Sequence, residues 1–165
     1  MAVVTVSAEP SCLLPDAPLL YAEDRAFIRA PEALLYRRLT HIAAWPGFWP
    51  RLTVAPAPTP SGEERWLVTV GAGWGRELRL VLRPHGYRHD LGFTLGLAGD
   101  LVGRGEFWLE PTHGGTVVHH LLVVRSPLPR PHRALEHLRR GVRAGLWGCK
   151  DAVQIEVRTA GGLVP

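Results

Sequence analysis

Hydrophobic and polar residues alternate through the middle of the chain, between residues 51 and 125. The alternation is clearest at 77–83, where Leu78, Leu80 and Leu82 share one face and charged side chains share the other. A period of two predicts half-buried strands, and the short connections between them require neighbouring strands to pair antiparallel. The expected strands cover residues 51–56, 64–71, 75–83, 87–95, 101–110 and 115–125.

Proline, glycine and polar residues separate these strands. We expect turns at Pro84-His85-Gly86, at Gly96 to Asp100 and at Thr112-His113-Gly114. Pro56 to Gly62 is expected as a longer connector. Gly71 to Gly75 resembles a phosphate-binding loop only in composition, so a connection between two strands is the better interpretation.

On both sides of this region the apolar spacing changes. Asp24 to Ala30 is expected as a short first strand, after which Pro31 and Glu32 open a helix as first-turn residues do. Trp45 to Pro50 contains two prolines and is expected as a bend or short second helix with three large aromatics to bury. A last helix is expected at 132–158, with an apolar stripe formed by Leu135, Leu138, Val142, Leu146, Cys149 and Val153.

Several features of the last helix leave alternatives open. Gly141, Gly145 and Gly148 lie beside the apolar stripe, and close packing against the sheet is favoured over a helix-pairing motif, which belongs to membrane helices. Trp147 falls on the polar side, either as a surface stacking residue or as part of a partner interface. The arginine cluster of this helix is expected mainly as a solvated face, with an anion contact as the alternative: Arg133, Arg139, Arg140 and Arg143.

Composition narrows the class of protein. The chain has 165 residues, 46% hydrophobic and 21% charged, which suits one globular domain that folds without a metal or disulfide. A net charge of +4 is too small to identify a nucleic-acid-binding protein. No apolar run approaches the roughly 20 residues of a membrane-spanning helix. The first 22 residues lack a basic start and contain Pro10 and Pro15, so we expect no secretory signal and a cytoplasmic protein.

The sequence contains few groups arranged for chemistry. Cys12 and Cys149 are expected as buried thiols. The eight histidines have no carboxylate or cysteine at metal-ligand spacing, so neither a metal site nor another cofactor is expected. No serine, cysteine or lysine stands in a nucleophile motif, and Glu77, Glu106 and Glu110 all fall in the outward phase of their strands.

Three segments of the sequence form a recognisable pattern. The first runs from Ile28 through Tyr36 to the Trp-Pro turn at 45–50. The second joins Phe107-Trp108-Leu109-Glu110-Pro111 to the glycine-rich turn that follows, and the third runs from Gly145 to Glu156. Together they resemble the START-like helix-grip superfamily, also called SRPBCC, which includes polyketide cyclase/dehydrase-type proteins, lipid-transfer domains and the major birch pollen allergen. His41 departs from the pattern, since many relatives carry an aspartate there, and the family offers no role for residues 1–22.

This resemblance implies an α+β fold in which a seven-stranded, curved antiparallel sheet wraps around a long C-terminal helix, with two short helices after the first strand. It divides the chain into a leader (1–22), a ligand-binding domain (23–158) and a tail (159–165). It also implies a cavity for an apolar small molecule between sheet and helix. The residues expected to line that cavity are Tyr36, Leu78, Leu80, Phe93, Phe107, Leu109, Val118, His120, Val142, Leu146 and Cys149.

His120 is the candidate catalytic residue. In the phase that the family implies, it points inward from the last strand, where it would orient a polar ligand group or act as a general acid or base. A structural histidine is the favoured alternative, because no second positioned group accompanies it. Catalysis would otherwise rely on Tyr36 or on residues at the cavity mouth such as Arg88 and Asp90.

Three functions remain open at this point. The first is binding, or binding and transport, of a hydrophobic small molecule such as a lipid or polyketide, and the second is a polyketide-type cyclase or dehydratase that uses His120. The third is a protein-interaction module, suggested by the apolar outer face around His119 and by Trp147. That face would suit a homodimer or packing under the leader. The expected partner is a hydrophobic small molecule, with no nucleic acid and no membrane span.

Overall fold

The computed structural model describes residues 14–59, 62–71 and 77–159. Cys12, most of the expected leader, and Ala72 to Gly75 of the glycine-rich connector lie outside the described residues. Along the chain the elements are β1 (Leu20–Ile28), α1 (Glu32–Thr40), the 3-10 helix η2 (Ile42–Gly47), β2 (Leu52–Pro56), β3 (Trp66–Val70), β4 (Leu78–Arg88), β5 (Gly92–Gly99), β6 (Val102–Thr112), β7 (Gly115–Arg125) and α2 (Pro131–Thr159).

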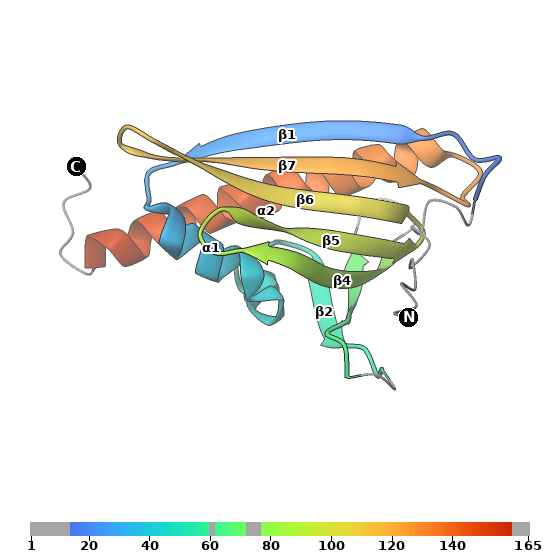
Figure 1. The fold of residues 1–165 in the computed structure, drawn as a ribbon, viewed down its shortest axis with the longest axis horizontal. Coiled ribbons are helices and arrows are strands. Elements are labelled where there is room, and N and C mark those ends of the chain that lie inside the picture. Colours follow the sequence, from blue (N-terminus) through green and yellow to red (C-terminus); the bar gives the residue numbers. More distant parts are fainter. Residues whose placement is uncertain (1–13, 60–61, 72–76, 160–165) are drawn as a thin grey trace, which may run out of the picture.

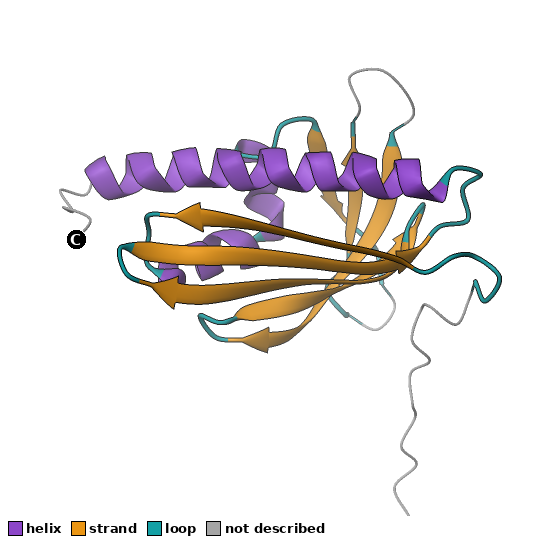
Figure 2. Ribbon diagram, turned by 90° about the horizontal axis from the view of Figure 1, so that it is seen from above, coloured by secondary structure: helices purple, strands orange, loops and turns teal. Residues whose placement is uncertain are grey.

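The strands form one antiparallel sheet in the order β1-β7-β6-β5-β4-β3-β2, so the first strand pairs with the last. Figure 1 shows α2 running along the back of this sheet, and Figure 2 shows from above how the strands curve along one side of the helix. The predicted helix-grip architecture is therefore confirmed, including α1 and η2 as the two short helices after the first strand.

Alternating burial along the strands marks the inner face of the sheet. In β7 every second residue from Thr116 to Val124 is buried, and the residues between them are partly exposed. This confirms the predicted phase, which turns His120 inward and His119 outward. In β4, Leu78, Leu80 and Leu82 are buried by the same pattern. One hydrophobic core fills the space between this face and α2.

The turn predicted at Pro84-His85-Gly86 is wrong. β4 continues through these residues to Arg88, and the chain reverses at residues 89–91. Gly86 has a φ of 59° and lies where the β4–β5 register shifts, which is typical of a bulge. Pro84 is tolerated because β3 pairs only as far as Leu82, so the missing N–H leaves no sheet hydrogen bond unmade on that side.

The first strand is longer than its pattern predicts. β1 begins at Leu20, inside the segment assigned to the leader, because every residue from Leu20 to Ile28 has a partner on β7. After β1 the chain turns into α1 and then η2, where Trp45 is buried and donates a hydrogen bond from its Nε1 to the Leu39 carbonyl (3.0 Å). The large aromatics of the Trp-Pro segment are thus packed inward, as expected.

The glycines of α2 allow a close approach, but mainly to a different element from the one expected. A Cβ at Gly145 would overlap the Trp49 indole, and a Cβ at Gly148 would overlap the carbonyl oxygen of Phe48. Only Gly141 approaches the sheet, where a Cβ would lie 2.9 Å from Cγ1 of Val70. Close packing was the right mechanism, but the partner is chiefly the Phe48–Trp49 segment after η2.

Two arginines of the α2 cluster are not a solvated face. Asp24 on β1 is buried and accepts hydrogen bonds from Arg139 (Nε, 3.0 Å) and Arg143 (Nε, 2.7 Å). Burial alone raises the pKa of Asp24, but the hydrogen bonds from both guanidinium groups outweigh it and hold that pKa below its usual value. These contacts tie the first half of α2 to the edge strand of the sheet.

Candidate ligand-binding site

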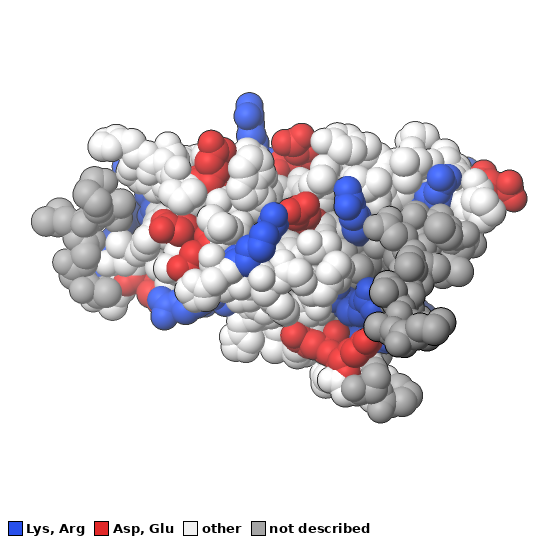
Figure 3. Space-filling model, viewed as in Figure 1, with Lys and Arg blue, Asp and Glu red and all other residues white. Residues whose placement is uncertain are grey.

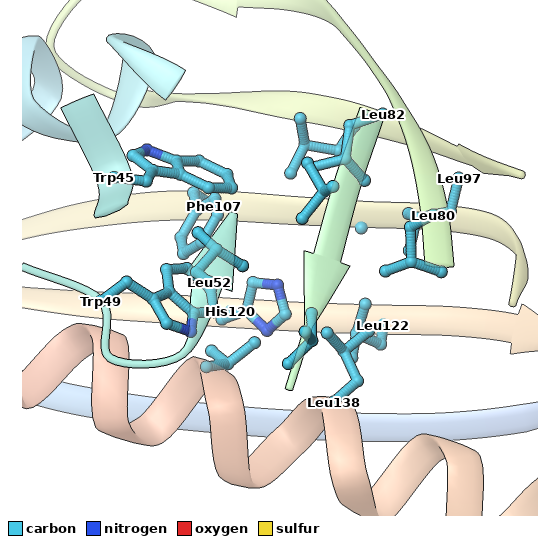
Figure 4. Close-up of a pocket in the computed structure, with 15 residues that line it drawn as sticks. Trp45, Trp49, Leu52, Leu80, Leu82, Leu97, Phe107, His120, Leu122 and Leu138 are labelled. Carbon is cyan, nitrogen blue, oxygen red and sulfur yellow. The ribbon is translucent and has the colours of Figure 1, made fainter. Parts of the chain in front are cut away.

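A small apolar cavity lies between the inner face of the sheet and α2 (Figure 4). Its volume is about 30 Å³. That is room for a water molecule or two, whereas sites for drug-sized ligands typically hold about 300 Å³ or more. The walls come from η2 and the segment after it, from all strands except β1, and from α2: Trp45, Trp49, Leu52, Val68, Val70, Leu80, Leu82, Leu95, Leu97, Gly105, Phe107, His120, Leu122, Leu138 and Val142.

Four of the residues expected at the cavity lie on its wall: Leu80, Phe107, His120 and Val142. Six others belong to the surrounding core without lining the cavity, namely Leu78, Phe93, Leu109, Val118, Leu146 and Cys149. Tyr36 does not line the cavity and packs against the core from its edge. It is half-buried on α1, and its ring is 5.4 Å from that of His89 in the β4–β5 turn.

The remaining wall residues were not expected to line the cavity, although the patterns of the sequence could have indicated several of them. Leu82 shares the face of Leu80, and Leu122 shares the face of His120. Trp45 and Trp49 were expected to be buried, but nothing in the sequence shows that they meet β6 and α2. Gly105 gives no hydrophobic signal at all, yet it opens part of the wall because it has no side chain.

Among the described residues, His120 is the only titratable side chain on the cavity wall. It is 3% exposed, its ring centre lies 4.5 Å from that of Phe107, and its Nδ1 has no hydrogen-bond partner among the described residues. Burial lowers the pKa of His120 to about 4, against a smaller opposing effect of Asp24, its cross-strand partner on β1. The imidazole is therefore neutral at pH 7, when it offers one donor and one acceptor.

Trp49 brings a second buried polar atom to the same cavity. Its Nε1, like Nδ1 of His120, has no hydrogen-bond partner within the described part of the chain. A buried N–H without a partner costs about 1–3 kcal/mol. Stacked and edge-on rings connect the two residues, because Trp49 packs on Trp45 (5.2 Å), and Trp45 packs on Phe107 (6.2 Å), which contacts His120. Figure 4 shows both nitrogen-bearing rings at the cavity.

The other candidate groups are engaged elsewhere. Arg88 forms an ion pair with Glu106 on the outer face, and Asp90 pairs with His89 (3.1 Å). Burial raises the pKa of the Cys149 thiol to about 11, so it is a buried and unreactive thiol. No group of three potential metal ligands occurs in the described ranges. No described helix has the length and apolar character needed to cross a membrane.

The outer face of the sheet is partly apolar. Trp108 is 49% exposed and stacks on His119 (4.6 Å between ring centres), and Tyr21 and Phe27 are exposed on the neighbouring strand β1. Figure 3 shows acidic and basic residues scattered over this face. His119 also contacts the carboxylate of Glu110 (2.8 Å). The expected homodimer remains a prediction.

No family model matches the sequence, and no curated protein matches it closely enough to count. Solved structures do match. They include TTHA0849 from Thermus thermophilus (TM-score 0.67, 17% identity, covering 84% of this chain and 99% of that one) and the Zhui aromatase/cyclase from Streptomyces sp. R1128 (TM-score 0.63, 18% identity, 88% and 100%). A START superfamily protein from Mycobacterium smegmatis matches with a TM-score of 0.62 and 17% identity, over 81% of this chain and 98% of that one. The resemblance noted in the sequence is thus confirmed in the fold, and the chain has the helix-grip architecture of START-like proteins.

Proposed function

We propose that this protein binds a hydrophobic small molecule that carries a hydrogen-bonding group, in the space between the sheet and α2. One observation carries the proposal: among the described residues of this largely apolar wall, His120 and Trp49 each have a buried nitrogen without a hydrogen-bond partner. A ligand oxygen is the group that would satisfy such nitrogens, while the surrounding leucines and valines would cover its hydrocarbon part.

Binding requires the cavity to enlarge, because about 30 Å³ holds no lipid or polyketide. The side chain best placed to move is Trp49. It belongs to a short segment after η2, and it packs over Gly141 and Gly145, where α2 offers no side chains to interlock with it. Rotation of the indole out of the core would vacate space between His120 and α2 and return its N–H to water.

A fluorescence titration with the neutral dye N-phenyl-1-naphthylamine tests the proposal. We expect saturable binding of one dye per chain, with emission enhanced by the apolar surroundings. Gly105→Val should weaken binding about tenfold, or ~1.4 kcal/mol, because the added side chain enters the cavity between Leu97 and Leu122. Arg104→Val is the matched control on the outer face of the same strand. Absence of saturable binding, or equal affinity of both variants, would contradict a ligand site in this cavity.

The second candidate is a cyclase or dehydratase, supported by the neutral, unpartnered imidazole of His120 in an apolar cavity. Such a group can accept a proton from an acidic carbon, although a pKa of about 4 makes it a weak base. The printed description of one structural neighbour as an aromatase/cyclase agrees with this chemistry. Incubation with a synthetic poly-β-ketone should give cyclised product with the wild type and none with His120→Gln. Equal product yields would end this hypothesis and leave the binding function standing.

A further inference from the structure

Three cationic side chains converge on a hollow that is separate from the apolar cavity. The hollow has a volume of about 380 Å³ and is lined by Arg29, Lys150, Gln154 and Arg158. We call it the basic hollow. Arg29 directly follows β1, and the other three residues lie on one side of the C-terminal half of α2. Figure 1 shows that the end of β1 and the last turns of α2 lie at the same end of the molecule.

These cations are not paired with carboxylates of the described chain. The ion pairs at this end use other residues, such as Arg38 with Glu156. Within the described ranges, none of Arg29, Lys150 and Arg158 forms a side-chain hydrogen bond or ion pair, and the ammonium of Lys150 lies over the ring of Trp147.

The helix dipole explains part of this arrangement but not all of it. Cations are favoured in the last turn of a helix, which accounts for Arg158. Arg29 follows β1 and does not belong to the helix. Its positive charge repels those of Lys150 and Arg158 unless an anion lies between them. Gln154 adds an amide that can donate a hydrogen bond to the same point.

We propose that the basic hollow binds a phosphate group. Two guanidinium groups, one ammonium and one amide provide the several converging donors that suit a multiply charged oxyanion. The Nζ of Lys150 lies 4.7 Å from the centre of the Trp147 ring, and this ring is 64% exposed. A phosphate that draws Lys150 into the hollow would therefore change the surroundings of an exposed tryptophan. The phosphate could belong to a soluble compound or to a lipid headgroup, and the two sources share this chemistry.

Calorimetric titration of the wild type with glycerol 3-phosphate tests whether the hollow binds the phosphate of a soluble compound. Sedimentation with phosphatidylglycerol vesicles, compared with phosphatidylcholine vesicles, tests the headgroup. Arg29→Gln and Arg158→Gln should each weaken whichever binding is seen by about tenfold. Arg133→Gln removes the same charge from an exposed position near the other end of α2 and should bind as the wild type does.

The outcomes separate cleanly. Binding of glycerol 3-phosphate that Arg29→Gln weakens would assign the hollow to soluble phosphates, and vesicle binding alone with the same dependence would assign it to headgroups. Absence of both, or equal losses in Arg29→Gln and Arg133→Gln, would overturn the proposal. Unchanged melting temperatures would show that the variants fold. Arg29→Gln is expected to leave binding of the neutral dye unchanged. The proposal of a phosphate site and the proposal of an apolar ligand site are therefore tested independently.

Discussion

A Cβ at Gly145 would lie 2.5 Å from Cε3 of Trp49, so the indole reaches its position over α2 only because residue 145 has no side chain. This contact fixes the Phe48–Trp49 segment against the helix and thereby closes one side of the cavity. Packing of α2 and the size of the cavity are therefore coupled through one aromatic side chain.

Gly145→Ala should destabilise the protein although alanine favours helix. The substitution gains about 1 kcal/mol of helix propensity, but the overlap with the indole costs more, since overpacking a core costs typically about 1–3 kcal/mol. We expect a net loss of roughly 1–2 kcal/mol in urea denaturation. In a Trp49→Leu background the same substitution should cost less, which a double-mutant cycle would show. A stabilising Gly145→Ala would mean that the indole does not occupy this position.

Trp49→Leu should increase the affinity for N-phenyl-1-naphthylamine. A leucine leaves more room above Gly141 and Gly145 and removes an N–H that has no partner in the described structure. We expect tighter dye binding by about fivefold or more, a gain of roughly 1 kcal/mol. Trp66→Leu is a control at a tryptophan outside the cavity, whose Nε1 donates to Glu64. Weaker binding by Trp49→Leu alone would show that the indole holds the dye rather than excludes it.

The stability of the protein should fall in mild acid because of His120. Its pKa is about 4 in the folded chain and about 6.5 when unfolded, so the unfolded state takes up the proton first as the pH falls. The neutral imidazole therefore contributes to the free energy of unfolding in full above about pH 6.5, and this contribution is lost as the pH falls toward 4. By pH 5 the loss amounts to roughly 2 kcal/mol.

Denaturation at pH 7 and pH 5 measures that loss, and His120→Leu is the matched variant. Its stability should change less between the two pH values, by about the same 2 kcal/mol. His85, whose pKa is lowered mainly by partial burial, contributes in the same direction in both proteins and cancels in the comparison. The lowered pKa of Asp24 affects stability only below about pH 4. Equal losses in wild type and variant would show that His120 is not a buried neutral group.

Asp24→Asn should loosen α2 from the sheet. The substitution removes the charge that accepts hydrogen bonds from Arg139 and Arg143, and we expect a loss of about 1–3 kcal/mol. The cost stays below that of a fully buried pair because both arginines can reach water. Glu23→Gln, at the exposed neighbouring position, is the control and should lose little. Amide hydrogen exchange in the first half of α2 should rise only in Asp24→Asn.

Period and spacing predicted the order of strands and helices, whereas the wrapped, seven-stranded arrangement was expected from the resemblance to START-like proteins. The alternation in β4 predicted its buried face, and the stripe of Leu135, Leu138 and Val142 predicted the buried face of α2. The inward phase of β7, which the structure confirms, came from the resemblance. Pro84 and Gly86 led to the wrong prediction of a turn at Pro84-His85-Gly86. A strand can continue through a proline that lies beyond the last residue paired with β3, and it can also continue through a glycine at a bulge. Local sequence does not show where a neighbouring strand stops pairing.

The site was harder to predict than the fold. The inward position of His120 was expected from the phase that the family resemblance implies, but its missing partner and lowered pKa depend on what surrounds it in three dimensions. Trp49 meets Gly141 and Gly145 across about ninety residues of sequence, and no periodic pattern reports such a contact. The pairing of Asp24 with two arginines of α2 escaped for the same reason, since charge alone suggested a solvated face.

Native mass spectrometry of the freshly purified wild-type protein would detect a ligand in the interior without any prior choice of compound. We expect a population that carries one apolar compound per chain, released by organic extraction, and a smaller such population in Gly105→Val. Spectra that show only the bare chain in repeated preparations, together with no bound species after addition of N-phenyl-1-naphthylamine, would contradict a ligand-binding interior.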